Sequence, residues 1–208
     1  MRIDLDSLEP QARYKLLTGT VVPRPIGWIS TVDMRGRRNL APFSYFQIAS
    51  ATPPVLLFSG SGRAGRPKDS VGNALATGGF VAHIADASLL EALNLTSVEA
   101  PPELDEFEFA GLAATPSDRV AAPRVTEAPV AFECELLHRY AIPGGTNTVV
   151  FGRVLVAHLR DGLMSGDGRI DVAALDPIAR LAGTLYARLG QVTDLARPPA
   201  WQQSSGPD

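Results

Sequence analysis

The fold of this chain is decided by the stretch Arg24-Pro25-Ile26-Gly27-Trp28-Ile29-Ser30-Thr31. From Ile26 to Val32 the chain is rich in β-branched and aromatic side chains, which favour an extended backbone. The turn-forming residues 33–36 follow, and the next extended segment is expected over 39–49. We therefore predict two strands that are joined by a hairpin-like connection.

Outward from this strand pair, short apolar runs alternate with turns that are rich in Gly and Pro. Pro23 and Pro25 remove backbone donors and fix φ, so residues 20–25 are not expected to be helical. Strands are predicted over 26–32, 39–49, 55–59, 80–84, 130–140 and 148–159. Short helices are predicted over 10–17, 68–76, 88–95 and 177–185.

Two further segments lack sustained periodicity. Residues 100–128 are rich in Pro, Ala and acidic side chains, so we expect an irregular surface segment that could act as a lid. Residues 196–208 are expected to form a disordered tail. Many strands with few, short helices favour a mainly β fold, an antiparallel barrel that forms one domain over residues 1–195.

The composition excludes several classes of partner and site. The chain has 208 residues and a net charge of −3, so no global positive field gathers nucleic acid or anionic lipid. Its single cysteine, Cys134, excludes an internal disulfide and any multi-cysteine zinc site. The acidic start at residues 1–6 is unlike a signal peptide, and no stretch approaches the roughly 20 apolar residues of a membrane span. We therefore expect a cytoplasmic protein that uses neither a membrane nor nucleic acid.

A candidate anion site lies where the helix over 68–76 begins. Backbone N–H groups are free at a helix start, and the helix dipole favours a negative group there. Arg66 and Lys68 would add charge and Ser70 a hydroxyl donor, while Asp69 would repel a phosphate and fits a helix cap better. The alternative is an ordinary capped helix whose charged residues face water.

Other catalytic and metal-binding patterns are missing. The sequence contains no glycine-rich dinucleotide loop, no Walker loop and no nucleophile elbow. His83, His138 and His158 fall in separate predicted strands without metal-ligand spacing, so we expect structural or surface roles for them. We therefore predict neither a metal site nor a catalytic side chain.

Several short motifs resemble the flavin reductase-like family, whose members have an FMN-binding split barrel. The resemblance covers about residues 10–190. It is carried, in order, by Arg24-Pro25-Ile26-Gly27-Trp28-Ile29-Ser30-Thr31, Asn39-Leu40-Ala41-Pro42-Phe43-Ser44-Tyr45-Phe46, Pro53-Pro54, Lys68-Asp69-Ser70 with Asn73, Phe80-Val81, Phe151-Gly152-Arg153-Val154, and Arg180-Leu181-Ala182-Gly183 with Tyr186.

This resemblance implies that FMN is the cofactor. The flavin ring and ribityl chain would be held by main-chain and hydroxyl groups of the strand pair, and Lys68 and Ser70 would contact the phosphate, with Arg66 as a helper. For Trp28 an ordinary core position is the alternative. The cofactor-binding residues that the resemblance implies are Trp28, Ile29, Ser30, Thr31, Asn39, Ala41, Ser44, Arg66, Lys68, Asp69 and Ser70.

The resemblance also implies a homodimer with flavin near the interface, and it leaves three functions open. The first is an NADH- or NADPH-dependent flavin reductase that passes electrons to free flavin, oxygen or a partner monooxygenase. The second is a flavin carrier that docks with another redox protein. The third is an FMN-dependent reductase or oxidase of an organic substrate. Asn147 stands where short-chain flavin reductases carry a nicotinamide-associated His, so the chain is more similar to the flavoredoxin-like branch.

Overall fold

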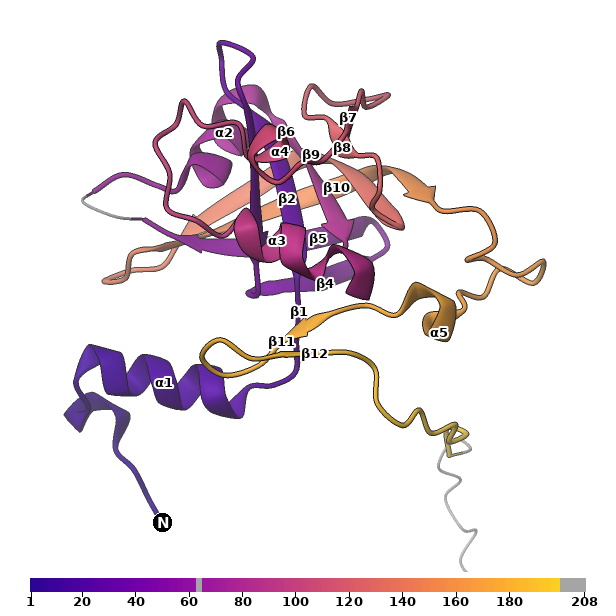
Figure 1. The fold of residues 1–208 in the computed structure, drawn as a ribbon. Helices are drawn as coiled ribbons and strands as arrows, with labels where there is room; N and C mark the ends of the chain where they lie inside the picture. Colours follow the sequence, from indigo (N-terminus) through magenta and orange to yellow (C-terminus); the bar gives the residue numbers. More distant parts are fainter. Residues whose placement is uncertain (63–64, 199–208) are drawn as a thin grey trace, which may run out of the picture.

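The centre of the molecule is a seven-stranded antiparallel sheet with the order β3-β2-β6-β9-β10-β5-β4 (Figure 1). The computed structural model describes residues 1–62 and 65–198. The two edge strands follow one another in the chain and are separated by Ser44 and Tyr45, so the sheet closes into a barrel that is split at this point. The strands are β2 (Gly27–Val32), β3 (Arg38–Phe43), β4 (Phe46–Ala51), β5 (Pro54–Ser61), β6 (Gly79–Ile84), β9 (Val130–Ala141) and β10 (Asn147–Leu159).

Apolar side chains fill the barrel and also cover its outer face beside β2. Phe58 and Phe80 meet inside the barrel with ring centroids 5.1 Å apart. On the outer face, Trp28 packs with Leu93 and Phe107. All six residues of β2 are buried because both faces of the strand are covered.

Short helices close the barrel and cover it. The helix α2 (Asp69–Thr77) places Val71 and Ala74 in the inner core and ends at Gly78, which adopts a positive φ. A 3-10 turn (Ala87–Leu89), α3 (Leu90–Leu95) and α4 (Glu106–Phe109) supply the outer cluster. The smaller elements are a 3-10 turn at Leu5–Ser7, β7 (Ala114–Thr115), β8 (Arg124–Val125) and α5 (Val172–Leu175).

A second, smaller unit projects from the barrel (Figure 1). We call it the appendage. It contains α1 (Pro10–Thr20), β1 (Arg24–Pro25), β11 (Ala179–Arg180) and β12 (Tyr186–Ala187), and its strands pair in the order β1-β11-β12. Thr18 is the one buried residue of α1. The appendage therefore contributes little apolar core of its own.

The mainly β fold with short helices, a split antiparallel barrel, is confirmed. The segment over 39–49 is not one strand, because the chain bends at Ser44 and Tyr45 and changes from β3 to β4. The helix expected over 177–185 is wrong: the backbone there pairs with β1 and turns at Gly183, whose φ is +58°.

Smaller differences concern the caps and the termini. Lys68 rather than Asp69 is the N-cap of α2, and Asp69 begins the helix.

Residues 100–128 are largely irregular, as expected. Of the predicted disordered tail, residues 196–198 lie in neither helix nor strand and 199–208 lie outside the described residues. The single-domain boundary stays a prediction. Among the described helices, none has the length and apolar character of a membrane span.

Candidate functional site

A cleft lies where the split of the barrel meets the appendage. It consists of two adjoining hollows that share Pro42, Ser61, Lys68 and Ser97. The larger hollow, about 700 Å³, is lined by the appendage on one side and by β3, β5 and β10 on the other. The smaller one, about 450 Å³, lies over β3 and the start of α2. Both volumes fall in the range of small-molecule sites.

The two hollows differ in charge. Arg24, Lys68 and Arg180 line the larger hollow, and the part of its lining that the structure describes contains no Asp or Glu, so we call it the basic half. Asp69, Glu99 and Glu106 line the smaller hollow, where Lys68 is the one cation among the described lining residues, and we call it the acidic half. An anionic group is therefore attracted to the basic half, with Lys68 at the junction.

Arg24 joins the appendage to the barrel. Its Nη1 donates to the carbonyls of Thr18 and Val21 at 2.7 Å each, and its Nη2 donates to the carbonyl of Leu181 at 2.9 Å. Its Nε lies 3.4 Å from Ser44 Oγ, at the bend between β3 and β4. The buried guanidinium therefore fixes one end of α1 and the C-terminal hairpin beside the cleft.

The other two cations of the basic half are held less tightly. Lys68 Nζ lies 5.7 Å from the centroid of the Phe43 ring, and no carboxylate of the described residues forms an ion pair with it. The Arg180 guanidinium lies 4.4 Å from the Tyr186 ring centroid and donates to the Gly183 carbonyl. Of the three described cations in the basic half, Lys68 is therefore best able to pair with a bound anion.

A hydrogen-bond network forms the floor of the acidic half. Ser70 Oγ donates to Asn39 Oδ1 at 2.7 Å, and Asn39 Nδ2 donates to Glu106 Oε1 at 3.0 Å. The Leu40 N–H donates to the other Glu106 oxygen at 3.0 Å. Burial raises the pKa of Glu106 despite these donors. The hydroxyl hydrogen of Ser70 is therefore already used within the protein.

The structure brings together some of the predicted site residues. Asn39, Ala41, Lys68, Asp69 and Ser70 line the acidic half. Ser44 and Lys68 line the basic half. Arg66 is exposed and lines neither.

The residues Trp28 to Thr31 do not line the cleft. All four are fully buried in β2, which lies between β3 and β6. Trp28 Nε1 donates to Thr96 Oγ1 at 2.8 Å, and Ser30 Oγ donates to the Pro123 carbonyl at 2.5 Å. Flavin contact by these residues stays a prediction, and their observed contacts are those of a core strand.

Sequence reasoning missed the appendage wall of the cleft. Tyr14, Arg24, Arg180 and Tyr186 line the basic half but were not expected to be site residues. Three of them belong to the motifs that carry the family resemblance. Membership of those motifs was the signal that could have identified them.

His83 has the structural role expected from the sequence. It is fully buried, its Nδ1 lies 2.8 Å from the Trp28 carbonyl, and its Nε2 accepts the Val125 N–H at 2.9 Å. Burial lowers the pKa of His83 to about 4, so the ring is neutral at pH 7. Burial also raises the pKa of the Cys134 thiol to about 12, which makes it an unreactive core residue.

The comparisons with known proteins agree with this architecture. The family model described as the flavin reductase like domain matches residues 18–174. A protein of Halalkalibacterium halodurans, BH2278, is 39% identical over 203 residues, which are 95% of this chain and 97% of the relative.

Two solved structures cover nearly the whole chain. Nitrilotriacetate monooxygenase component B from Bacillus cereus has a TM-score of 0.90 and 37% identity over 94% of this chain and 98% of its own. The 2-nitrobenzoate 2-nitroreductase NbaA of Pseudomonas fluorescens has a TM-score of 0.88 and 28% identity over 99% and 100%.

Proposed function

Because the chain belongs to the flavin reductase-like family, we propose that it binds FMN in the cleft and is a flavin reductase. NADH or NADPH would supply the electrons, and free flavin or a partner monooxygenase would accept them. The single observation that carries this proposal is the basic half of the cleft, which Lys68 lines and whose described lining residues include no Asp or Glu.

The residues of the cleft fit FMN in size and in chemistry. FMN joins a flat ring to a phosphate, so it needs an apolar surface, hydroxyl or amide donors and a cation. Phe43 supplies apolar surface, Ser44, Ser59 and Asn147 supply polar groups, and Lys68 supplies the charge. Sites for such ligands combine apolar surface with a few converging polar groups in this way.

The chain itself would bind and orient rather than transfer protons. Lys68 would attract the phosphate by a charge-assisted hydrogen bond. Ala41 and Ser44 would lie along the ring or the ribityl chain, and Asn39 would keep β3 in place through its bonds to Ser70 and Glu106. FMN, when bound, supplies the capacity to accept and return a hydride, which needs no catalytic acid or base from the protein.

We further propose a cytoplasmic homodimer in which a second copy covers the appendage. Tyr14 and Leu17 on α1 are 57% and 44% exposed, and Ile48 on the edge strand β4 is 66% exposed. An 11-residue helix with one buried side chain is marginal unless other surfaces pack on it. Tyr14 also lines the basic half, so a partner on α1 would lie beside the bound flavin.

An anaerobic titration tests the reductase proposal. The purified protein is supplemented with FMN and titrated with NADH and then NADPH while the flavin absorbance band is followed. Rapid bleaching by either donor is expected. If the bound flavin stays oxidised with both, the chain is not a nicotinamide-dependent reductase, and if no flavin binds, the whole proposal is wrong.

A second candidate function is FMN-dependent reduction of an organic substrate. It is favoured by the likeness to the 2-nitrobenzoate 2-nitroreductase and by three cations around one hollow. A change in the bound-flavin spectrum on adding a nitroaromatic acid would support it. The flavin carrier remains a third alternative, and an oxidised flavin that neither nicotinamide bleaches would favour it.

A further inference from the structure

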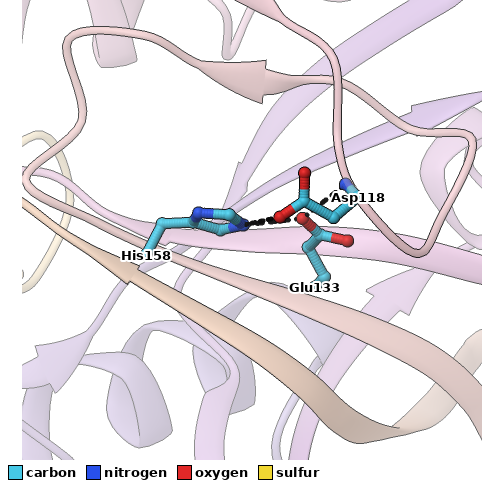
Figure 2. A group of neighbouring side chains, drawn as sticks. All are labelled: Asp118, Glu133 and His158. Carbon is cyan, nitrogen blue, oxygen red and sulfur yellow. Dashed lines mark hydrogen bonds and ion pairs between the residues drawn. The ribbon is translucent and has the colours of Figure 1, made fainter.

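Beside strands β9 and β10, three side chains from separate segments of the chain meet (Figure 2). We propose that Asp118, Glu133 and His158 bind a divalent transition-metal cation. One ligand atom of each residue lies within 4.8 Å of the other two. None of the three residues lines the cleft, so the proposal does not depend on flavin binding.

The sheet register places two of the ligands on one face. Glu133 of β9 pairs with Val156 of β10, and His158 pairs with Ala131, so the two side chains are diagonal neighbours. His158 Nε2 lies 2.6 Å from Glu133 Oε1. The third residue, Asp118, comes from the irregular segment that crosses this face, and its Oδ2 lies 3.9 Å from His158 Nε2.

The observed separations of 2.6 Å and 3.9 Å lie on either side of the distance between ligand atoms in a metal site. Metal–ligand distances of about 2.0–2.1 Å to N and O in a tetrahedral site put ligand atoms roughly 3.3 Å apart. The His158 and Glu133 atoms would move apart slightly and the Asp118 carboxylate would move closer. Asp118 is free to do so, because its side chain is 64% exposed.

Glu133 is already oriented by the backbone. Its side chain is fully buried, and it accepts the Asp118 N–H on Oε1 at 2.9 Å and the Arg119 N–H on Oε2 at 2.6 Å. Hydrogen bonds of this kind commonly fix metal-binding carboxylates. Each carboxylate oxygen can accept more than one bond, so Oε1 keeps capacity for a cation.

The donor set determines the class of cation. Two carboxylates carry a charge of −2, which one divalent cation neutralises. An imidazole nitrogen is a poor ligand for Mg²⁺ and Ca²⁺ and a good one for Zn²⁺ and its neighbours. The His158 side chain is 23% exposed, so the cation can enter from solvent beside Asp118. Three protein ligands leave a fourth position for water.

The competing explanation is a purely structural bond between His158 and Glu133 that holds residues 117–119 on the sheet. Asp118→Ala separates the two explanations. The backbone N–H of Asp118, not its side chain, contacts Glu133, so this substitution leaves the structural bond in place. The substitution should therefore lower the affinity for a cation if Asp118 is a ligand, and it should leave the protein unaffected if the bond is purely structural.

The test is a Zn²⁺ titration of the full chain, treated with chelator and then loaded with FMN. Isothermal calorimetry should show one Zn²⁺ per chain. His158→Ala should abolish binding, and Asp118→Ala should weaken it by tenfold or more. The matched controls are His138→Ala and Asp194→Ala, both at exposed residues, and neither should change the affinity.

A second readout is thermal unfolding with and without Zn²⁺. The wild-type Tm should rise with Zn²⁺, and the Tm of Asp118→Ala should match the wild type without the metal and stay unchanged with it. The proposal is overturned if Zn²⁺ does not bind, if Asp118→Ala binds it as tightly as the wild type, or if His138→Ala removes the binding.

Discussion

The barrel and the appendage differ in how they are held together. The barrel buries large side chains on both faces of β2, whereas α1 buries Thr18 alone. The appendage is held together by backbone pairing of β1 with β11 and by the Arg24 contacts to Thr18 and Leu181, and Arg24 Nε also lies 3.4 Å from Ser44 Oγ of the barrel. Substitutions in the barrel should therefore change stability through side-chain packing. Substitutions in the appendage should change it through solvation, helix propensity or contact with a partner.

The largest effect is expected from Gly152→Ala, inside the barrel. The new Cβ would lie 2.8 Å from Cys134 Cβ and closer still to the Phe80 ring, and both neighbours are fully buried. Such overpacking should lower the free energy of unfolding by about 3 kcal/mol. Urea denaturation at pH 7.5 measures this loss. A loss under 0.5 kcal/mol would mean that the barrel packs more loosely than described.

The second effect concerns pH and His83, which is fully buried on the outer face of β6 between Trp28 and Val125. Because its pKa of about 4 in the folded state lies below the ordinary 6.5, the unfolded chain takes up the proton first as the pH falls. His83 therefore stabilises the fold fully above pH 6.5, and this contribution is lost between pH 6.5 and 4. The loss should be on the order of 3 kcal/mol.

Urea denaturation of the wild type and His83→Gln across this pH range measures the His83 contribution. The wild type should lose more stability than the variant as the pH falls. Equal slopes in the two proteins would show that other groups cause the acid sensitivity.

The third effect compares the two walls of the cleft. Lys68→Ala on the barrel wall should weaken FMN binding by roughly 1–3 kcal/mol, the loss typical of a charge-assisted hydrogen bond. Arg180→Ala on the appendage wall should have a smaller effect, because its guanidinium already contacts Gly183 and Tyr186. Fluorescence titration with FMN measures both. If the order is reversed, the phosphate lies on the appendage wall.

The smallest effect is expected from Gly19→Ala in the appendage, and its sign should be opposite to that of Gly152→Ala. The added Cβ would lie 3.9 Å from Ala182 Cβ, an ordinary contact. Replacing a helical Gly with Ala should stabilise by about 0.5–1 kcal/mol. Thermal unfolding and sedimentation at several concentrations check this prediction. A destabilised dimer would show that a second copy packs closely on α1.

Much of the fold could be predicted from local sequence. Residues 26–32, 130–140 and 148–159 form strands because β-branched and aromatic side chains and flanking turns favour them. The helix predicted over 177–185 fails because pairing with Arg24 and Pro25 overrides local preference. The family was likewise identifiable from short motifs in order along the chain, and its model matches residues 18–174.

The candidate site depended on the tertiary structure. Lys68 and Asn39 were predicted from local motifs and do line the cleft, but the burial of Trp28 follows from the cover that α3 and α4 provide, and Ile29 faces the inner core. The same holds for the cluster of Asp118, Glu133 and His158, since no local spacing places these residues together.

The sequence by itself determined the strands, the family and the candidate anion-binding lysine of this protein. Only the tertiary structure decided which half of the cleft is basic, because Arg24, Lys68 and Arg180 come from three distant segments. Propensity and periodicity act over a few neighbouring residues, whereas the charge of a cavity and the exposure of a side chain are sums over every segment that surrounds them.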